Sequence, residues 1–320
     1  MNNTFQGVVG KIFLNVLPRN FYPMAHINFQ EQPALPKRLV KRAMSVVFAL
    51  ICITFLQTSC DEDDKDARTN TAEELTLNDL SYGPDTYNTM DLYLPAGRTK
   101  ETRIVLFIHG GGWREGSKEQ FSAIVDDFVD EGFVAAAINY RPANVEANIN
   151  YIQLLDDIDT ALKFLSENAS QYVYNSNSVH LFGHSAGAHL GLLYAYRNNP
   201  RGQVKSVISL SAPTDLEGLL ENDVFPTLLY NLVGSDDLEK FKDASPINHV
   251  SPSSVPTFFI HGKSDQSVPY QQSEILFQQL TQWNKLANEL ELIENEGHDF
   301  SEEAQTIIVS ESIAYLKRRN

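Results

Sequence analysis

Short apolar runs alternate with amphipathic stretches along the chain from about residue 75 onward. The runs Ile104–Ile108, Phe133–Ile138 and Ser178–Phe182 are mostly apolar and have the length expected of buried strands. Between the first two, apolar residues recur at helical spacing, and Ser117 with Gln120 predicts a capping box at the start of a helix. Repeated strand, helix, strand units predict an α/β fold, a mostly parallel sheet with helices on both sides.

Two other segments frame this pattern. Leu75–Tyr82 and Asn88–Leu94 alternate in polarity around a Gly-Pro-Asp turn, which predicts an edge hairpin. The stretch 214–254 is long for a connection and contains several large apolar residues. We expect a small helical cap beside a pocket there, and an ordinary crossover helix with a loop is the alternative. Residues 75–320 are predicted to form one domain.

The pentapeptide Gly183-His184-Ser185-Ala186-Gly187 lies between an apolar run and a helical stretch. A serine on a sharp strand-to-helix turn adopts strained backbone angles, and small neighbours keep the turn from colliding with other chain segments. The hydroxyl of Ser185 would then stand at a helix N-terminus, whose dipole favours developing negative charge. Taken alone, the same letters would also fit a tight turn with an exposed serine.

A second motif follows the run Ile104–Ile108, namely His109-Gly110-Gly111-Gly112-Trp113. Successive glycines leave backbone N–H groups unshielded by any Cβ, so such a loop can direct donors toward an oxyanion. We expect the amides of Gly111, Gly112 and Ala186 to act as these donors. A flexible linker is the alternative for a bare run of glycines.

A serine nucleophile needs a base, normally histidine, and a carboxylate that fixes the tautomer of that base. Asp265 follows the strand-like run Pro256–His261, and His298 follows Glu291–Ile293. Loops after parallel strands meet at one edge of the sheet. The sequence therefore predicts a triad of Ser185, Asp265 and His298.

Other polar residues near these motifs receive different assignments. Asp299 adjoins His298 and is the alternative acid, whereas Asp215 is expected to cap the helix that follows it. His184 and His189 are predicted to be packing or rim residues. His109 and His261 are predicted to form hydrogen bonds with the backbone.

These motifs together resemble a known family. The chain, from about Tyr82 to its C-terminus, is similar to α/β-hydrolases of the esterase/lipase kind that carry an HGGGW oxyanion loop. It resembles their acetyl- and feruloyl-esterase-like branch, which is related to hormone-sensitive-lipase-type esterases and kynurenine formamidases. Further matching segments are Asn139–Pro142, Ala244–Ile247, His261–Pro269 and Gly297–Phe300. The resemblance implies a serine carboxylic-ester hydrolase for short acyl or feruloyl esters of carbohydrate.

Two other functions stay open on the sequence. An arylformamidase-like amidase would use the same residues, and a non-catalytic binding lipoprotein could retain the fold. The eight histidines form no zinc-type pair and there is no Cys-x-x-Cys, so the sequence predicts neither a metal nor a cofactor.

The first 59 residues predict an export signal. Basic residues precede an apolar run from Ser45 to Leu56, and small residues then lead to Cys60. This resembles a bacterial lipoprotein signal with Cys60 as the lipidated residue, although Gln57 stands where leucine is usual. Residues 60–74 are predicted to be an acidic tether, and Asp61–Asp64 resembles an outer-surface tag. We expect an exported protein anchored to a bacterial membrane by the lipid.

Charge agrees with export and limits the binding partners. The chain holds 25 Lys and Arg against 41 Asp and Glu, a formal net charge of −16. Residues 1–59 contain six of the former and one of the latter, so their removal leaves −21. Such an acidic surface disfavours nucleic acid and anionic lipid. Only Cys60 would remain after processing, which excludes an internal disulfide, and the sequence predicts no oligomeric state.

Overall fold

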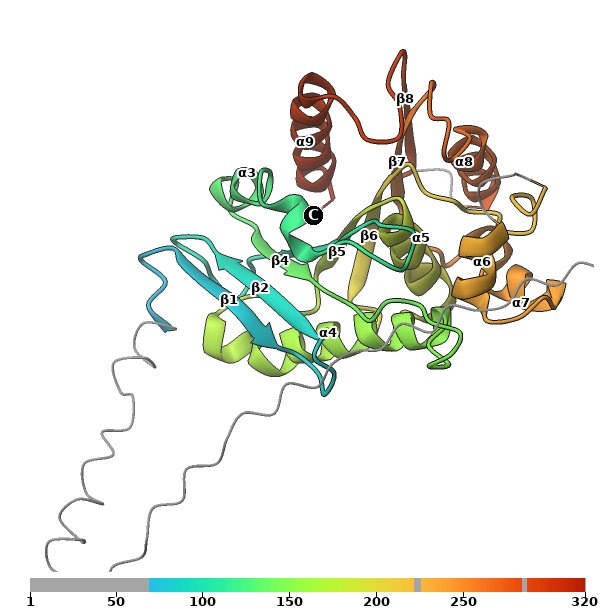
Figure 1. Ribbon diagram of the computed structural model, residues 1–320. Helices are drawn as coiled ribbons and strands as arrows, with labels where there is room; N and C mark the ends of the chain where they lie inside the picture. The colour runs from blue at the N-terminus through green and yellow to red at the C-terminus, as the bar shows by residue number, and fades with distance from the viewer. Residues whose placement is uncertain (1–68, 222–225, 284–286, 320) are drawn as a thin grey trace, which may run out of the picture. The chain divides into compact units, whose positions relative to one another are not determined.

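The computed structural model describes residues 69–221, 226–283 and 287–319. The predicted export signal at 1–59, the lipidation site Cys60 and the tether up to residue 68 lie outside these residues. The described residues form an eight-stranded sheet with helices on both faces (Figure 1). The order of its strands is β1-β2-β4-β3-β5-β6-β7-β8.

The strands and helices have the following bounds. The strands are β1 Leu75–Ser81, β2 Thr89–Leu94, β3 Ile104–Ile108, β4 Val134–Ile138, β5 Val179–His184, β6 Val204–Leu210, β7 Thr257–Gly262 and β8 Glu289–Ile293. The α-helices are α3 Val125–Asp130, α4 Tyr151–Tyr172, α5 Ala186–Leu193, α6 Pro226–Val233, α7 Leu238–Asp243, α8 Gln271–Trp283 and α9 Glu302–Lys317. Short 3-10 or π turns are η1 Lys118–Phe121, η2 Tyr194–Asn198 and η3 Pro246–His249.

The sheet is parallel except at one edge. The hairpin β1–β2 is antiparallel, as predicted, and β2 joins β4 antiparallel. From β4 to β8 every pairing is parallel. Ile108 at the end of β3 lies opposite Ile138 and Gly183, so the strands end level. The loops that follow them therefore meet at one edge, which is where ligands bind in such sheets.

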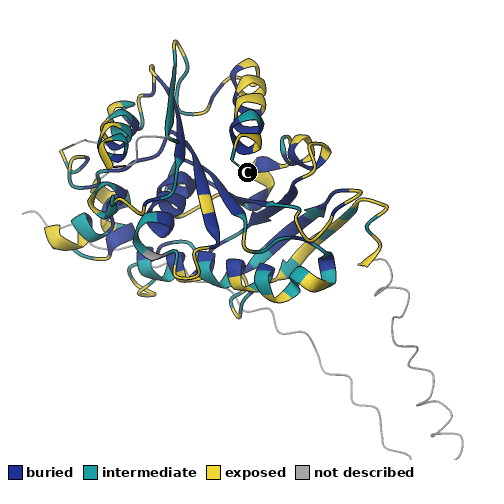
Figure 2. Cartoon of the chain, turned by 180° about the vertical axis from the view of Figure 1, so that it is seen from behind, coloured by how far each residue is buried: buried dark blue, intermediate teal, exposed yellow. Residues whose placement is uncertain are grey.

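Alternate residues of each central strand supply the cores on the two faces. In β3, Leu106 and Ile108 pack with α4 and α5, whereas Val105 and Phe107 pack with α3 and α9. Figure 1 shows α3 and α9 on one side of the sheet and α4 with α5 on the other. Figure 2 shows the central strands almost entirely buried. Burial on both faces explains why these strands are mostly apolar runs in the sequence.

The first predicted helix is not continuous, which corrects the expectation from the sequence. The short turn η1 and the helix α3 are separated near Ile124, whose backbone leaves helical geometry at φ −124° and ψ −15°. Ser117 makes no side-chain cap. The side-chain amide of Gln120 forms hydrogen bonds with Gly110 and His184 instead of closing a capping box. Tertiary partners have thus taken the side chain that the local pattern assigned to the helix start.

The long stretch 214–254 forms a small helical insertion between β6 and β7. It contains α6, α7 and η3, and residues 222–225 are not among the residues that the structure describes. Leu229, Leu232 and Val233 bury one face of α6 in the core. Leu228 of the same helix borders the groove described below, so the insertion forms one wall of it.

The described end of the predicted 60–74 tether is bound to the domain. The guanidinium of Arg98 donates hydrogen bonds to the carbonyls of Asn70 and Glu73, at 2.8 and 3.0 Å. The carbonyl of Thr71 accepts a bond from the amide of Gly97. From Asn70 on, the segment is therefore fixed against the loop that follows β2. No helix in the described ranges is long and apolar enough to cross a bilayer.

Candidate active site

Ser185 occupies the sharp turn between β5 and α5. Its backbone angles, φ 53° and ψ −119°, fall in a region that non-glycine residues rarely adopt. Its amide donates to the carbonyl of Leu210, 2.8 Å away, which fixes the turn on the neighbouring strand. A side chain on Gly187 would collide with the carbonyls of Ile108 and His109. The glycine thus lets the elbow press against the end of β3, as the pentapeptide predicts.

Two distant loops bring an imidazole and a carboxylate to this serine. His298 Nε2 lies 2.9 Å from Ser185 Oγ, and His298 Nδ1 lies 2.7 Å from Asp265 Oδ2. Asp265 follows β7 and His298 follows β8, so both reach the serine from the carboxyl edge of the sheet. The three predicted residues form one unbroken hydrogen-bonded chain. Their order is that of a nucleophile, its base and an orienting acid.

The carboxylate of Asp265 is held by four donors. Oδ1 accepts the amides of Ser267 and Val268, each at 2.8 Å. Oδ2 accepts His298 and, at 3.1 Å, His261 Nε2. Burial alone would raise the pKa of Asp265, but the hydrogen bonds from His261 and His298 outweigh burial and hold it well below its usual range. Asp265 is therefore an anion at any pH at which the base works.

Neither the side chain of Asp299, the alternative acid, nor that of Asp215 bonds the His298 ring. The side chain of Asp299 is 88% exposed, and its nearest imidazole nitrogen is His184 Nε2 at 4.0 Å. Asp215 accepts the amide of Gly218 at 3.1 Å, within its own turn. The structure thus selects Asp265 among the three carboxylates as the partner of His298.

An open groove of about 540 Å³ runs over this chain of residues. Gly111, Gly112, Ser185, His298 and Leu228 line part of it. Gly111 has φ +100° and Gly112 has φ +57°, conformations that glycine adopts readily. The three-glycine loop therefore passes directly beside the serine.

Three amides near Ser185 have no acceptor in the part of the chain that the structure describes. No atom among the described residues accepts a hydrogen bond from the backbone N–H of Gly111, Gly112 or Ala186. Ala186 is the first residue of α5, where the N–H groups of a helix lack internal partners. These are the three donors that the sequence predicts for an oxyanion, and their N–H groups are free to serve one.

The two histidines that flank Ser185 do more than the packing or rim role predicted for them. His184 Nε2 donates to the carbonyl of His298 at 2.9 Å, and Nδ1 accepts from the amide of Gln120 at 3.0 Å. On the other side, His189 Nδ1 accepts the indole N–H of Trp113 at 3.1 Å, and Nε2 donates to the carbonyl of Ala244 at 2.8 Å. Their place beside the serine was visible in the sequence, whereas their partners were not.

Burial keeps these histidines neutral. It lowers the pKa of His189 to about 4 and also lowers the pKa of His184. His109 makes the backbone contact expected of it, since Nδ1 donates to the carbonyl of Gly110 at 2.7 Å. His261 Nε2 likewise donates to the carbonyl of Val268 at 2.9 Å, besides its contact with Asp265.

An open, mostly parallel sheet with a serine elbow after β5, an acid after β7 and a histidine after β8 defines an α/β-hydrolase. The BD-FAE family model matches residues 90–280, and the chain belongs to this family. The matched segment begins in β2, ends in α8, and includes both the glycine loop and the elbow.

Sequence relatives are named as esterases. The chain is 30% identical over 229 residues to "Probable carboxylic ester hydrolase LipM" of Mycobacterium tuberculosis, covering 65% of this chain and 52% of the relative. It is 26% identical over 220 residues to "Probable isoprenylcysteine alpha-carbonyl methylesterase ICME" of Oryza sativa, covering 62% of this chain and 52% of the relative. The chain thus spans about half the length of the curated relatives it matches.

A solved structure shares the fold. It is described as a truncated form of a carbohydrate esterase from gut microbiota, and it superimposes with a TM-score of 0.64 at 20% identity. The superposition covers 77% of this chain and 98% of that structure.

Proposed function

We propose that the protein is a serine carboxylic-ester hydrolase that works through the triad Ser185, His298 and Asp265. The observation that carries this proposal is the unbroken contact from carboxylate to imidazole to hydroxyl, at 2.7 and 2.9 Å, beside three free backbone amides. Membership of the BD-FAE family and the esterase names of the relatives support it.

The geometry is suited to each step of acyl transfer. Ser185 Oγ attacks the ester carbonyl while His298 Nε2 takes its proton, and Asp265 stabilises the imidazolium that forms. The carbonyl oxygen becomes an anion that the amides of Gly111, Gly112 and Ala186 stabilise. His298 then returns the proton to the leaving alcohol. Water hydrolyses the acyl-serine by the same sequence of proton transfers.

We expect the glycine loop to contribute strongly to this rate. Loss of a single oxyanion donor typically costs about 3 kcal/mol of transition-state stabilisation. The free energy comes from dipoles that are already oriented before the reaction begins. The positive φ of Gly111 is part of that preorganisation.

As substrates we propose short acyl or feruloyl esters of carbohydrate. The support is the predicted export of the chain, its resemblance to acetyl- and feruloyl-esterases, and a fold neighbour described as a carbohydrate esterase. The groove is open to solvent and walled in part by polar residues, among them Arg114, Glu115 and Gln120, which suits a hydroxylated alcohol.

We also propose that the chain is exported, cleaved before Cys60 and anchored to a bacterial membrane, with residues 75–320 as the catalytic domain. This rests on the sequence of residues 1–64 and on the acidic charge of the remainder. The acidic surface leaves attachment to the lipid alone.

Hydrolysis of p-nitrophenyl acetate tests the enzymatic proposal. The wild-type protein is expected to turn the ester over, and Ser185→Ala is expected to abolish turnover. Wild-type inactivity across short-chain esters would support a non-catalytic binding protein instead. A panel of acetylated and feruloylated oligosaccharides beside aryl formamides then separates an esterase from an arylformamidase-like amidase.

A further inference from the structure

We propose that Gln120 and His184 form a positioning relay that holds the base His298 at a fixed distance from the oxyanion loop. The proposal rests on the function proposed above. Neither residue touches the reacting atoms. Both act through the backbone of loops that carry the catalytic groups.

Three hydrogen bonds make up the relay. The amide of Gly110 donates to Gln120 Oε1 at 2.7 Å. Gln120 Nε2 donates to His184 Nδ1 at 3.0 Å. His184 Nε2 donates to the carbonyl of His298 at 2.9 Å. The relay thus joins the loop after β3 to the loop after β8, which lie on opposite sides of β5.

The direction of each bond is fixed by the first one. A backbone N–H can only donate, so Gly110 requires the oxygen of the Gln120 amide to face it. The amide nitrogen therefore faces His184 Nδ1, which must be an acceptor. The single imidazole proton then lies on Nε2, where it meets the carbonyl of His298. Only a neutral His184 satisfies all three bonds, and burial favours that form by lowering its pKa.

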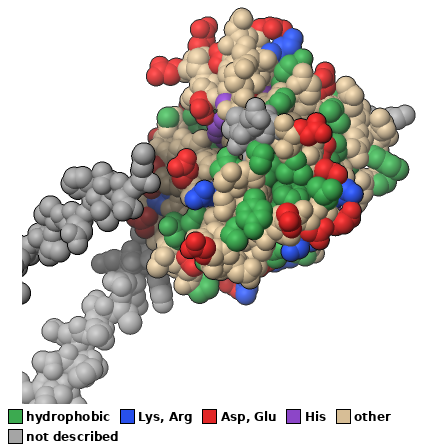
Figure 3. All heavy atoms as spheres, turned by 45° about the vertical axis from the view of Figure 1, so that its right-hand side comes forward, with side chains coloured by type: hydrophobic (Ala, Val, Ile, Leu, Met, Phe, Trp, Pro, Cys, Tyr) green, Lys and Arg blue, Asp and Glu red, His purple; other side chains and the backbone are tan. Residues whose placement is uncertain are grey.

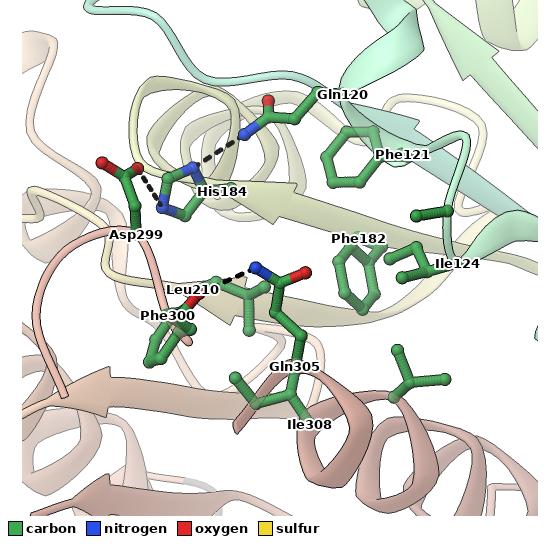
Figure 4. A pocket seen from close by; sticks show the side chains of 12 residues that line it. Gln120, Phe121, Ile124, Phe182, His184, Leu210, Asp299, Phe300, Gln305 and Ile308 are labelled. Atoms are coloured by element: carbon green, nitrogen blue, oxygen red, sulfur yellow. Dashed lines mark hydrogen bonds and ion pairs between the residues drawn. The ribbon is translucent and has the colours of Figure 1, made fainter. Parts of the chain in front are cut away.

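The side chains of Gln120 and His184 are held mainly by their hydrogen bonds, because a cavity lies beside them. A cavity of about 190 Å³ adjoins Gln120 and His184, and its floor is formed by apolar side chains such as Phe121, Phe182 and Leu210. Figure 4 shows the amide of Gln120 directed at the His184 ring above this space. Gln120 is itself exposed. Tight packing therefore does not hold the two side chains on the cavity side.

The hydrogen bond from His184 holds the backbone carbonyl of the same residue that carries the base. The rings of His184 and His298 lie 5.0 Å apart, and in this loop conformation His298 Nε2 is 2.9 Å from Ser185 Oγ. Small displacements of a catalytic group lower kcat strongly, because the reaction needs near-attack geometry. Loss of the relay is therefore expected to lower kcat more than it changes KM.

The first test measures kcat and KM for p-nitrophenyl acetate in Gln120→Leu, His184→Leu and the double variant. We expect each single change to lower kcat at least tenfold, with KM within threefold of wild type. The double variant should be no slower than the slower single variant, because both remove the same relay. Gln279→Leu is the matched control, since Gln279 bonds Ile247 away from the groove.

A second test separates the two bonds of His184. In His184→Gln the amide can donate near the position of Nε2, whereas His184→Asn can only mimic Nδ1. We expect the glutamine variant to recover more of kcat than the asparagine variant. Circular dichroism and the thermal midpoint identify the folded variants, and the exposed position of Gln120 keeps at least one variant testable.

Three results would overturn the relay. The first is kcat in both single leucine variants within twofold of Gln279→Leu. The second is a double variant whose loss is the product of the single losses. The third is a kcat of His184→Gln no higher than that of His184→Asn. Activity that persists in Ser185→Ala would instead refute the proposed function. The two failures are thus distinguishable.

Discussion

Ser185 combines the reactive hydroxyl with an unfavourable backbone conformation. At φ 53° and ψ −119° a side chain costs about 1–3 kcal/mol, and glycine is spared most of this cost. We expect the free energy of unfolding of Ser185→Gly to be about 1 kcal/mol higher than that of Ser185→Ala. This figure already allows for the greater conformational freedom of glycine in the unfolded chain. Both variants lack the hydroxyl, so the difference isolates strain. Equal urea midpoints for the two would contradict a strain of this size.

Asp265 should make the stability of the protein depend on pH. Its pKa in the folded protein lies below the ordinary value of about 4, so its contribution is complete above that value and is lost as pH falls toward the lower pKa. Wild type should therefore lose more unfolding free energy between pH 6 and pH 3 than Asp265→Asn does. Urea unfolding at both pH values measures this. An equal loss in the two proteins would contradict the low pKa.

The residues that lie where the sequence predicts them differ from Gln120, whose predicted cap does not form, in the range of their interactions. Ser185 and the glycine loop carry their signal in adjacent letters, because a tight turn needs small neighbours. Gln120 also has a local signal, its spacing from Ser117, and that signal is wrong. Its real partners, Gly110 and His184, are set by how the strands pair, which no local pattern encodes.

At the scale of elements, the strands were the most predictable part. Burial on both faces makes β3 and β4 apolar throughout and β7 largely so, and the bounds of all three agree with the predicted runs to within a residue. The stretch after the glycine loop has helical spacing but divides into η1 and α3. Lys118 helps to fix this region by a buried ion pair with Asp91, at 2.9 Å. Pairing between distant elements has overridden the helical pattern.

The helix α6 should influence substrate preference. Leu228 lines the groove beside Gly112, so Leu228→Ala is expected to widen it. We expect the ratio of kcat/KM for p-nitrophenyl butyrate over acetate to rise about tenfold, a typical value for a methylene-sized change. Tyr230→Ala on the same helix is the control, because Tyr230 is exposed and does not line the groove. An unchanged ratio in Leu228→Ala would mean that the insertion is an ordinary crossover.

At the scale of the whole molecule, the acidic net charge affects how the protein can attach to a membrane. Acidic side chains are spread over the face in Figure 3 and do not form a single patch. With a formal charge of −16 on the chain, electrostatic binding to an anionic membrane is unfavourable. Membrane attachment would then depend on the lipid at Cys60.

Replacement of Cys60 tests that dependence. In a bacterium that processes lipoproteins, Cys60→Ser should abolish incorporation of labelled palmitate and move the esterase activity out of the membrane fraction. Cys52→Ser is the matched control, since Cys52 lies within the predicted signal and should leave labelling intact. Labelling that survives in Cys60→Ser would refute the predicted anchor.

Covalent labelling of the serine tests the central claim most directly. A fluorophosphonate probe followed by peptide mass spectrometry should find one adduct, on Ser185, with loss of p-nitrophenyl acetate turnover in proportion to labelling. His298→Ala should slow labelling at least about 100-fold, because the base no longer activates the hydroxyl. An adduct on another residue that accounts for the lost activity, or ester hydrolysis that continues with Ser185 fully labelled, would contradict the account.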